Sequence, residues 1–283
     1  VTATSFAGDG SALTGTNRTI SAVASGSLSN GSTVIINTDG TVSVIETTDP
    51  GTPTFGSATV FESANTQETA ATFDTANGKV VIAYRDNGNS NYGTAIVGTV
   101  SGTSISFGSA VVYASSASYD PALTYDSTNG KVVIAYRDSG NSQYGTAIVG
   151  TVSGTSISFG SAVVFESADT RDASAIFDST NNKVVITYRD NGNSQYGTAI
   201  VGTVSGTSIS FGSAVVFESA ASHNSAATFD SSNGKVVIAY RDDGNSYYGT
   251  AIVGTVSGTS ISFGTPVVFN SATTTQIGAG FDS

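Results

Sequence analysis

The sequence contains no cysteine, no methionine and no tryptophan, and only 11% of its 283 residues are charged. The absence of cysteine excludes disulfide bonds, redox motifs and thiolate metal sites. No apolar run reaches the roughly 18 residues that a membrane span requires, and no basic stretch followed by an apolar one indicates a signal peptide. We therefore expect no insertion into a membrane.

Basic residues are scarce as well. Ten Lys and Arg stand against 21 Asp and Glu, which gives a formal net charge of −11. Because phosphate binding needs clustered Lys and Arg, nucleic acid is not an expected partner. The chain is nevertheless 39% hydrophobic, with 12 Tyr and 14 Phe, which is typical of a folded protein and not of a disordered one.

An internal repeat dominates the sequence. "GKVVIAYRD" begins at Gly78 and returns at 130 and 234, with "NKVVITYRD" at 182, so the period is 52 residues. "GTAIVGTVSGTSISFG" occurs unchanged at 93, 145, 197 and 249. Each repeat must be one structural unit. The repeats lie near 66–117, 118–169, 170–221 and 222–273, with a partial fifth at 274–283.

Each repeat has the signals of antiparallel strands. Its β-branched and aromatic runs are separated by Asn-Gly and Ser-Gly turn formers, and no segment has a helical period. In the second repeat we expect four strands, which cover about Ala122 to Asp126, Lys131 to Arg137, Tyr144 to Val152 and Thr155 to Phe165.

Four-stranded units of this length favour an all-β fold, a β-propeller of four-stranded blades. At least four complete blades are present, and five or more are expected. "FGSATVF" at 55 and "IGAGFDS" at the end resemble the outer and inner strands of one further blade, which could close a five-bladed ring. A linear β-solenoid is the competing geometry, although its coils are usually shorter than 52 residues.

The first fifty residues lie outside the repeat. We predict a small β or fibre module at 1–50, joined by a Pro- and Gly-containing linker at Thr47 to Pro53 to the propeller domain at 51–283. "NTDGTV" from Asn37 predicts an Asp-Gly hairpin.

Two resemblances add to this interpretation. "TSFAGDGSALTG" and "GSLSNGSTVIINTDGTVSV" resemble segments of tail-fibre and other virion appendage proteins of tailed phages, especially marine ones. This resemblance implies an extracellular, often trimeric fibre part that carries or is carried by host-recognition modules.

The repeat in turn is similar to the blades of sialidase-like (Asp-box) propellers, whose hairpin reads Ser-x-Asp-x-Gly-x-Thr-Trp. The hairpin "TVSGTSISF" keeps the Gly and a closing hydroxyl-aromatic pair such as Ser106-Phe107, while Ser101 and its copies stand where that family has Asp.

The sequence argues against an enzyme. Arg85 and its copies, and the acids that follow them, occupy one equivalent position in each repeat, whereas catalytic groups have different roles and break symmetry. The single His223 has no His partner for a catalytic metal. A glycoside hydrolase with paired carboxylates remains the alternative.

Candidate binding residues are those that differ between repeats. They fall in the link between units and in the turn after "YRD", which antiparallel strands bring to one rim. Tyr, Arg, His, Asn and Gln there could bind sugar or protein, and free drift of exposed loops is the other explanation. The predicted ligand-binding residues are Gln67, Glu68, Asn87, Asn91, Tyr119, Asp120, Ser139, Gln143, Arg171, Asp172, Asn191, Gln195, His223, Asn224, Asp243 and Tyr247.

The constant part of the turn motif favours a structural role. We expect Arg85 and its copies to form ion pairs or to bind backbone carbonyls. "DNGNS" offers oxygens for Ca²⁺ but lacks the several carboxylates of dedicated calcium loops, so no cofactor is predicted.

The sequence thus predicts a non-enzymatic extracellular module of a virion tail fibre. Its partners would be a host surface glycan or protein and other fibre subunits, and we expect a homo-oligomer that binds by avidity. The alternative is a secreted bacterial adhesin or surface-filament subunit at the cell surface.

Overall fold

The computed structural model describes residues 23–24, 34–44 and 56–282, and the chain divides into two compact units, Val1–Gly56 and Ser57–Ser283. In the first unit, β2 (Val34–Ile36) and β3 (Thr41–Val44) form an antiparallel hairpin, and β1 (Val23–Ala24) pairs in parallel with β3. The predicted Asp-Gly hairpin is confirmed, because Gly40 takes a φ of +80° and Asp39 Oδ1 accepts from the Thr41 backbone N–H at 2.9 Å. The predicted linker lies outside the described residues.

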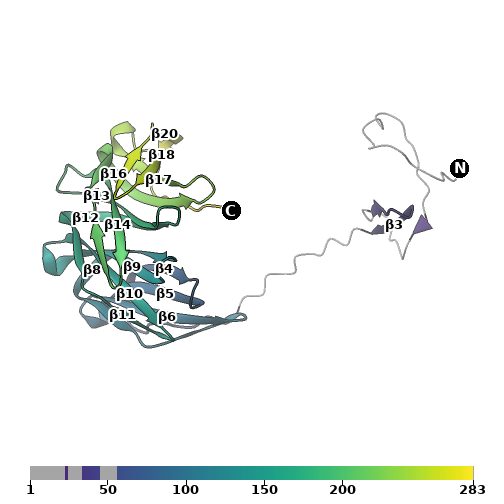
Figure 1. Ribbon diagram of the computed structural model, residues 1–283, viewed down its shortest axis with the longest axis horizontal. Helices are drawn as coiled ribbons and strands as arrows, with labels where there is room; N and C mark the ends of the chain where they lie inside the picture. The colour runs from purple at the N-terminus through teal and green to yellow at the C-terminus, as the bar shows by residue number, and fades with distance from the viewer. Residues whose placement is uncertain (1–22, 25–33, 45–55, 283) are drawn as a thin grey trace. The chain divides into compact units, whose positions relative to one another are not determined.

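The second unit consists of four antiparallel sheets, each made from one repeat (Figure 1). We name them the first to fourth sheets. The first contains β4 (Thr66–Asp74), β5 (Lys79–Asp86), β6 (Tyr92–Ser101), β7 (Ser104–Phe107) and the start of β8 (Val111–Asp126). The second contains the rest of β8, β9 (Lys131–Asp138), β10 (Tyr144–Ser153), β11 (Ser156–Phe159) and the start of β12 (Val163–Asp178).

The third and fourth sheets repeat this arrangement. The third contains the rest of β12, β13 (Lys183–Asp190), β14 (Tyr196–Ser205), β15 (Ser208–Phe211) and the start of β16 (Val215–Asp230). The fourth contains the rest of β16, β17 (Lys235–Asp242), β18 (Tyr248–Ser257), β19 (Ser260–Phe263) and β20 (Val267–Thr273). Three of the turns after the second strands are short 3₁₀ helices, η1 (Asn87–Asn89), η2 (Ser139–Asn141) and η3 (Asp243–Asn245).

The sequence placed a loop between repeats, and this prediction is wrong. In β8, β12 and β16 the outer strand of one sheet continues without a break as the inner strand of the next. In β8, Ala117 pairs with Tyr92 in the first sheet, and the next residue, Ser118, pairs with Asp138 in the second. The Asp-Pro pair in β8 looked like a loop, but it forms a β-bulge, where proline is tolerated because a ladder bond is already missing.

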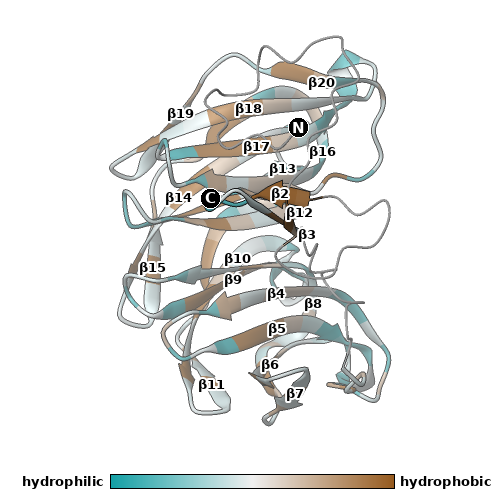
Figure 2. Ribbon diagram, turned by 90° about the vertical axis from the view of Figure 1, so that its right-hand side faces the viewer, coloured by the Kyte–Doolittle hydropathy of each residue, from teal (hydrophilic) through white to brown (hydrophobic). Residues whose placement is uncertain are grey.

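Neighbouring sheets pack face to face through aromatic clusters. Phe165 leaves the second sheet and packs against Tyr188 and Phe211 of the third, with ring centroids 5.3 and 5.7 Å apart. Tyr113 and Phe217 make the same contacts one repeat earlier and later. Apolar side chains of the central strands are buried on both faces. Figure 2 shows hydrophobic segments, in brown, along these strands.

The described sheets do not close into a ring. They follow one another along an arc with β4 near one end and β20 at the other (Figure 1), and no strand register joins these two within the described residues. Phe269 of β20 is 56% exposed, whereas its equivalent Phe217 is 7% exposed. Residues 274–282, predicted to begin another repeat, form no strand, because none of the described strands pairs with them.

The structure therefore shows a nearly all-β chain of repeated sheets of four strands, in which the outer strand is divided into two segments, such as β7 and the start of β8, that both pair with β6. The number of blades and the closure of the propeller stay predictions. Every strand pair in the four sheets is antiparallel, unlike the parallel coils of a β-helix, which argues against the solenoid alternative. No helix in the described part of the chain has the length and apolar character to cross a membrane.

Candidate functional site

The two variable segments of each repeat meet at one rim, as the strand order predicted. The backbone carbonyl of Asn91, in the turn, accepts a hydrogen bond from the Ser118 N–H, beside the bulge, at 3.2 Å. The same bond joins Thr170 to Gln143, Ser222 to Gln195 and Thr274 to Tyr247, at 2.9 to 3.3 Å. Sequence variation between repeats is thus concentrated on one rim of the sheets.

One residue in each bulge has a left-handed backbone conformation. Glu68, Asp120, Asp172 and Asn224 hold the same place in successive repeats and all have a φ of 50–52°. Asp and Asn tolerate this left-handed region better than other side-chain-bearing residues, and Glu does so at a cost. These half-buried and exposed residues lie in a kinked strand, not in a free loop.

The turn after "YRD" contains two further left-handed residues in each repeat. Ser90 and Asn91 have φ values of 57° and 63°, and the equivalent pairs are Ser142-Gln143, Ser194-Gln195 and Ser246-Tyr247. Glycine would adopt this conformation without strain, yet none of the eight positions is glycine. Side chains are kept there at an energetic cost of order 1 kcal/mol each.

The constant Asp of the motif holds this turn together. Asp86 Oδ1 accepts from the Asn89 N–H at 3.1 Å, and Asp190 Oδ1 accepts from the Gly192 and Asn193 N–H groups at 2.9 and 3.1 Å. Asp138 and Asp242 cap their turns in the same way. Part of each carboxylate's acceptor capacity is therefore used by the backbone of its own turn.

The constant arginines form ion pairs, as predicted. Arg85 pairs with Glu68 at 3.6 Å, Arg189 with Asp172 at 3.2 Å, and Arg241 with Asp243 at 2.7 Å. Arg137 lies between Asp120 and Asp169, at 3.6 and 3.5 Å. Each arginine side chain is at most 21% exposed, so it anchors the variable acid beside it.

Tyr119 lies between two of these arginines. The guanidinium carbons of Arg85 and Arg137 are each 4.5 Å from its ring centroid, on neighbouring sheets. Cation–π contacts of this kind contribute about 0.5–2 kcal/mol each. The Tyr119 ring therefore joins the first and second sheets. The two guanidinium groups cover its faces, which makes them less available to a ligand than the sequence-based prediction assumed.

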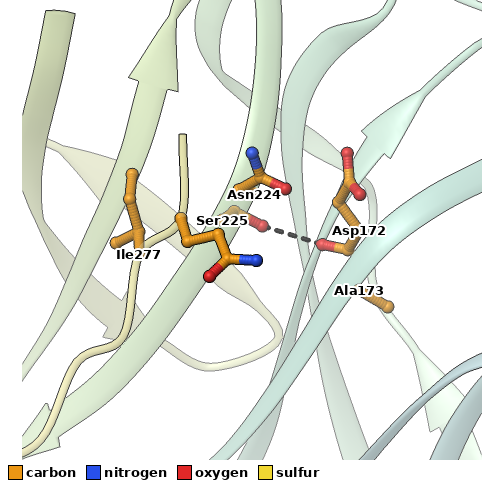
Figure 3. A pocket seen from close by; sticks show the side chains of 6 residues that line it. Asp172, Ala173, Asn224, Ser225 and Ile277 are labelled. Atoms are coloured by element: carbon orange, nitrogen blue, oxygen red, sulfur yellow. Dashed lines mark hydrogen bonds between the residues drawn. The ribbon is translucent and has the colours of Figure 1, made fainter. Parts of the chain in front are cut away.

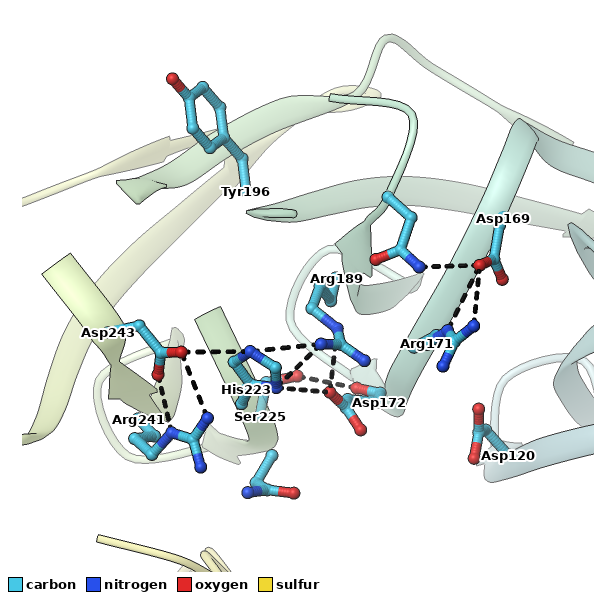
Figure 4. Close-up of polar contacts among 12 residues, drawn as sticks. Asp120, Asp169, Arg171, Asp172, Arg189, Tyr196, His223, Ser225, Arg241 and Asp243 are labelled. Atoms are coloured by element: carbon cyan, nitrogen blue, oxygen red, sulfur yellow. Dashed lines mark hydrogen bonds and ion pairs between the residues drawn. The ribbon is translucent and has the colours of Figure 1, made fainter. Parts of the chain in front are cut away.

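Asp169 contacts three side chains, and it is not among the residues predicted from the sequence to bind a ligand. Its Oδ2 accepts from both Arg171 Nε and Nη2 at 3.2 Å, as Figure 4 shows, and from Asn191 Nδ2 at 2.7 Å. Its Oδ1 lies 3.5 Å from Arg137 Nη1. The equivalent residues in other repeats include Asn65 and Ala117, so comparison of the repeats could have identified this position.

His223 connects the third and fourth sheets. Its Nδ1 is 2.8 Å from Arg189 Nη1, and its Nε2 is 3.2 Å from Asp243 Oδ2 (Figure 4). Burial, and then the nearby Arg189 charge, lower the pKa of His223 below its ordinary value. A neutral ring satisfies both contacts, because Nδ1 accepts from the arginine while Nε2–H donates to the carboxylate.

This depressed pKa predicts a pH-dependent stability. Below the ordinary pKa of 6.5, the unfolded chain takes up a proton at His223 before the folded chain does, so this residue's contribution falls as pH falls from 6.5 through the lower folded value. We expect the His223→Gln variant to lose less stability between pH 7 and pH 5 than the wild type, measured by urea unfolding. An equal loss in both would contradict the assignment.

We next consider whether the acidic residues of this rim could act as a general acid or bind a metal ion. Burial raises the pKa of Asp120, as a general acid would require, although Arg137 opposes the shift. Within residues 23–24, 34–44 and 56–282, no group of three or more His, Cys, Asp or Glu could hold a metal ion. We assign no catalytic role to these acids.

The opposite rim is uniform for structural reasons. Asp126 Oδ1 accepts from the Thr128 and Asn129 N–H groups at 3.0 and 2.9 Å, and its Oδ2 accepts from Asn129 Nδ2 at 2.8 Å. Asp74, Asp178 and Asp230 make the same bonds in their repeats. The "DSTNG" turn is therefore required once per sheet.

Most of the predicted site residues have recorded side-chain contacts. The constant arginines are contacted by Glu68, Tyr119, Asp120, Asp172, His223 and Asp243, whereas Arg171 and Asn191 both bind Asp169. Gln143 and Tyr247 each contact the arginine of their own repeat, and Asn224 donates to the Thr275 carbonyl. The structure records no side-chain hydrogen bond or ion pair, among described residues, for Gln67, Asn87, Asn91, Ser139 and Gln195.

Comparisons with known proteins concern the fold. No protein-family model and no curated protein matches the sequence. The chain is similar to the crystal structure of a triple arginine-to-alanine mutant of AofleA from Arthrobotrys oligospora, with a TM-score of 0.51 and 9% identity over 75% of this chain and 60% of that one. It is also similar to an exo-β-1,3-galactanase from Phanerochaete chrysosporium bound to β-1,3-galactotriose, with a TM-score of 0.45 and 12% identity over 71% and 54%. At 9% identity the likeness to the first structure concerns the fold alone, and the chain spans less than two thirds of either structure.

Proposed function

We propose that this protein is a non-enzymatic recognition module that binds glycans through the variable rim. One observation carries the proposal: two of the variable positions in each repeat, those of Glu68 and Asn91, have left-handed backbone and carry side chains in all four repeats. If exposed residues merely drifted, glycine would be free to appear where the backbone favours it. Its absence from the four variable turn positions, at Asn91 and its equivalents, and from the four bulge positions supports selection for side chains there.

The chemistry of the rim suits sugars. It combines carboxylates, amides, guanidinium groups and a histidine, which together donate and accept hydrogen bonds, and the exposed Tyr247 adds an aromatic ring. The ion pairs hold many of these groups in fixed positions before any ligand arrives, which reduces the entropy lost on binding. Repetition over four sheets supports several weak contacts with one extended or multivalent glycan.

A rim swap within the chain tests the proposal. The double variant Arg171→Gln, Asp172→Glu places the first repeat's residues at the third repeat's bulge, where the backbone is the same. We expect at least about tenfold weaker binding to a glycan identified on an array of bacterial polysaccharides and neutral and sialylated oligosaccharides, equivalent to about 1.4 kcal/mol. The melting temperature should change little.

The matched control makes the same kind of swap on the opposite rim. Ser127→Thr with Thr128→Ala places the first repeat's Thr75-Ala76 in the second repeat and should leave binding unchanged. The proposal fails if the wild type binds no glycan on the array, or if the rim swap and the control behave alike. Release of reducing sugar from the bound glycan would instead indicate a hydrolase.

Residues 1–50 bear on the kind of assembly to which the module belongs. We propose that it belongs to an extracellular appendage of the tail-fibre type and assembles as a homo-oligomer with other fibre subunits, on the resemblance of those residues to such proteins. A secreted adhesin is the alternative. Sedimentation of the full chain tests the assembly: an oligomer is expected, and a monomer at micromolar concentration would contradict it.

A further inference from the structure

A pocket opens between the third and fourth sheets, at the same rim. It has a volume of about 340 Å³, at the small end of the range for ligand pockets. Three neighbouring backbone segments line it: Asp172 and Ala173 from β12, Asn224 and Ser225 from β16, and Gln276 and Ile277 beyond β20 (Figure 3). The lining repeats one pair of equivalent positions three times, with a different polar group each time.

The carboxylate of Asp172 is the one ionisable group in this lining, and it is held in place. Its Oδ2 lies 3.2 Å from Arg189 Nε and 3.9 Å from His223 Nδ1. The ion pair with Arg189 uses Oδ2, so Oδ1 keeps acceptor capacity for hydroxyl groups of a ligand. A carboxylate fixed by an arginine is prepared to accept hydrogen bonds without losing further side-chain freedom.

Amide and hydroxyl groups line the same pocket. Asn224 Nδ2 donates to the Thr275 carbonyl at 2.7 Å, so its amide oxygen is positioned as an acceptor. Ser225 Oγ donates to the Asp172 carbonyl at 2.9 Å, as Figure 3 shows. The exposed Gln276 offers both a donor and an acceptor, and Ala173 and Ile277 add an apolar surface.

We propose that this pocket binds one neutral sugar ring through two adjacent hydroxyl groups. Asp172 would accept from these hydroxyls, Asn224 and Gln276 would bind the flanking ones, and Ile277 would pack against the C–H face of the ring. An acidic sugar is disfavoured, because its carboxylate or sulfate would approach Asp172 in a chain of net charge −11. This inference rests on the proposed glycan-binding function.

Two variants test the pocket in the full chain. Gln276→Ala removes an exposed side chain without a recorded structural contact and should weaken binding of a neutral oligosaccharide about threefold to tenfold. Asp172→Asn keeps a residue that tolerates the left-handed backbone, and should weaken it tenfold or more. Thr103→Ala, on the opposite rim, is the control and should bind like the wild type.

The measurement is calorimetric titration with the neutral oligosaccharide that binds most tightly on the array, and with its sialylated or sulfated form. The acidic form should bind more weakly. If no glycan binds at all, the proposed function fails together with this inference. If a neutral glycan binds and both pocket variants bind it like the wild type, or if acidic forms bind better, this inference alone is overturned.

Discussion

Replacing Phe217 by alanine is expected to lower the free energy of unfolding by about 3–5 kcal/mol, the usual cost of emptying a buried aromatic site. Phe217 is 7% exposed and packs between Tyr240 and Phe263, with ring centroids 5.1 and 5.8 Å away. It joins the third sheet to the fourth, so its loss weakens an interface as well as a core. Urea unfolding followed by circular dichroism measures the change.

The chain supplies its own control for this experiment. Phe269 holds the equivalent position in the fourth sheet but is 56% exposed, because no sheet covers it. Phe269→Ala should therefore change the unfolding free energy by about 1 kcal/mol or less. A large loss at Phe269 would mean that its face is covered in solution, by a further copy of the chain or another sheet, and would contradict the open arc.

The second large expected effect on stability is that of replacing a glycine that lies against the next sheet. A Cβ atom on Gly160 would lie 1.9 Å from the Thr207 carbonyl oxygen of the next sheet, and backbone cannot move aside cheaply. At the equivalent Gly264 a Cβ would be 3.7 Å from its nearest recorded neighbour, the Val253 carbonyl oxygen, an ordinary contact. We expect Gly160→Ala to cost about 3 kcal/mol or more and Gly264→Ala to be nearly neutral.

The glycine comparison separates packing from backbone freedom. Neither glycine has a positive φ, so alanine is conformationally acceptable at both positions and only the contact between sheets differs. Thermal unfolding of the two variants side by side gives the result. Equal melting temperatures would show that the sheets approach less closely around Gly160 than the structure indicates.

The repeat explains how much of the fold could be predicted. Identical "GTAIVGTVSGTSISFG" segments required identical units, and the alternation of β-branched residues with Asn-Gly and Ser-Gly turns fixed strands and hairpins. The sheet boundaries follow from the same period. Closure could not be derived, because it depends on whether another sheet covers Val267 and Phe269, which are 65% and 56% exposed in this chain.

The strand that crosses between sheets could not be predicted from local residues. "ASYDPA" combines a turn former with proline, which usually ends a strand. The tertiary structure overrides this tendency. The change of chain direction is confined to a bulge in which Asp120 has a φ of 50°, and the chain is extended on both sides of it. Pairing with two different sheets, which local sequence does not encode, keeps the strand continuous.

The sequence predicted where the variable segments lie, but it predicted few of the contacts that their side chains make. Antiparallel order was enough to place the variable segments on one rim. The stacking of Tyr119 between Arg85 and Arg137, the bonds gathered by Asp169, and the pocket beside Gln276 depend on side chains from neighbouring repeats. Such contacts between repeats have no signature within one repeat, so the structure was needed to find them.

Chemical-shift mapping tests the central claim most directly. Backbone amide spectra of the 28.3 kDa chain, recorded during titration with a glycan found on the array, identify the residues that the ligand touches. Glycan recognition by the variable rim predicts shifts concentrated at the bulges and at the turns after "YRD", with the largest near Asp172 and Asn224. Shifts centred on the uniform "DSTNG" and "VSGTS" turns, or no shifts at saturating glycan, would contradict it.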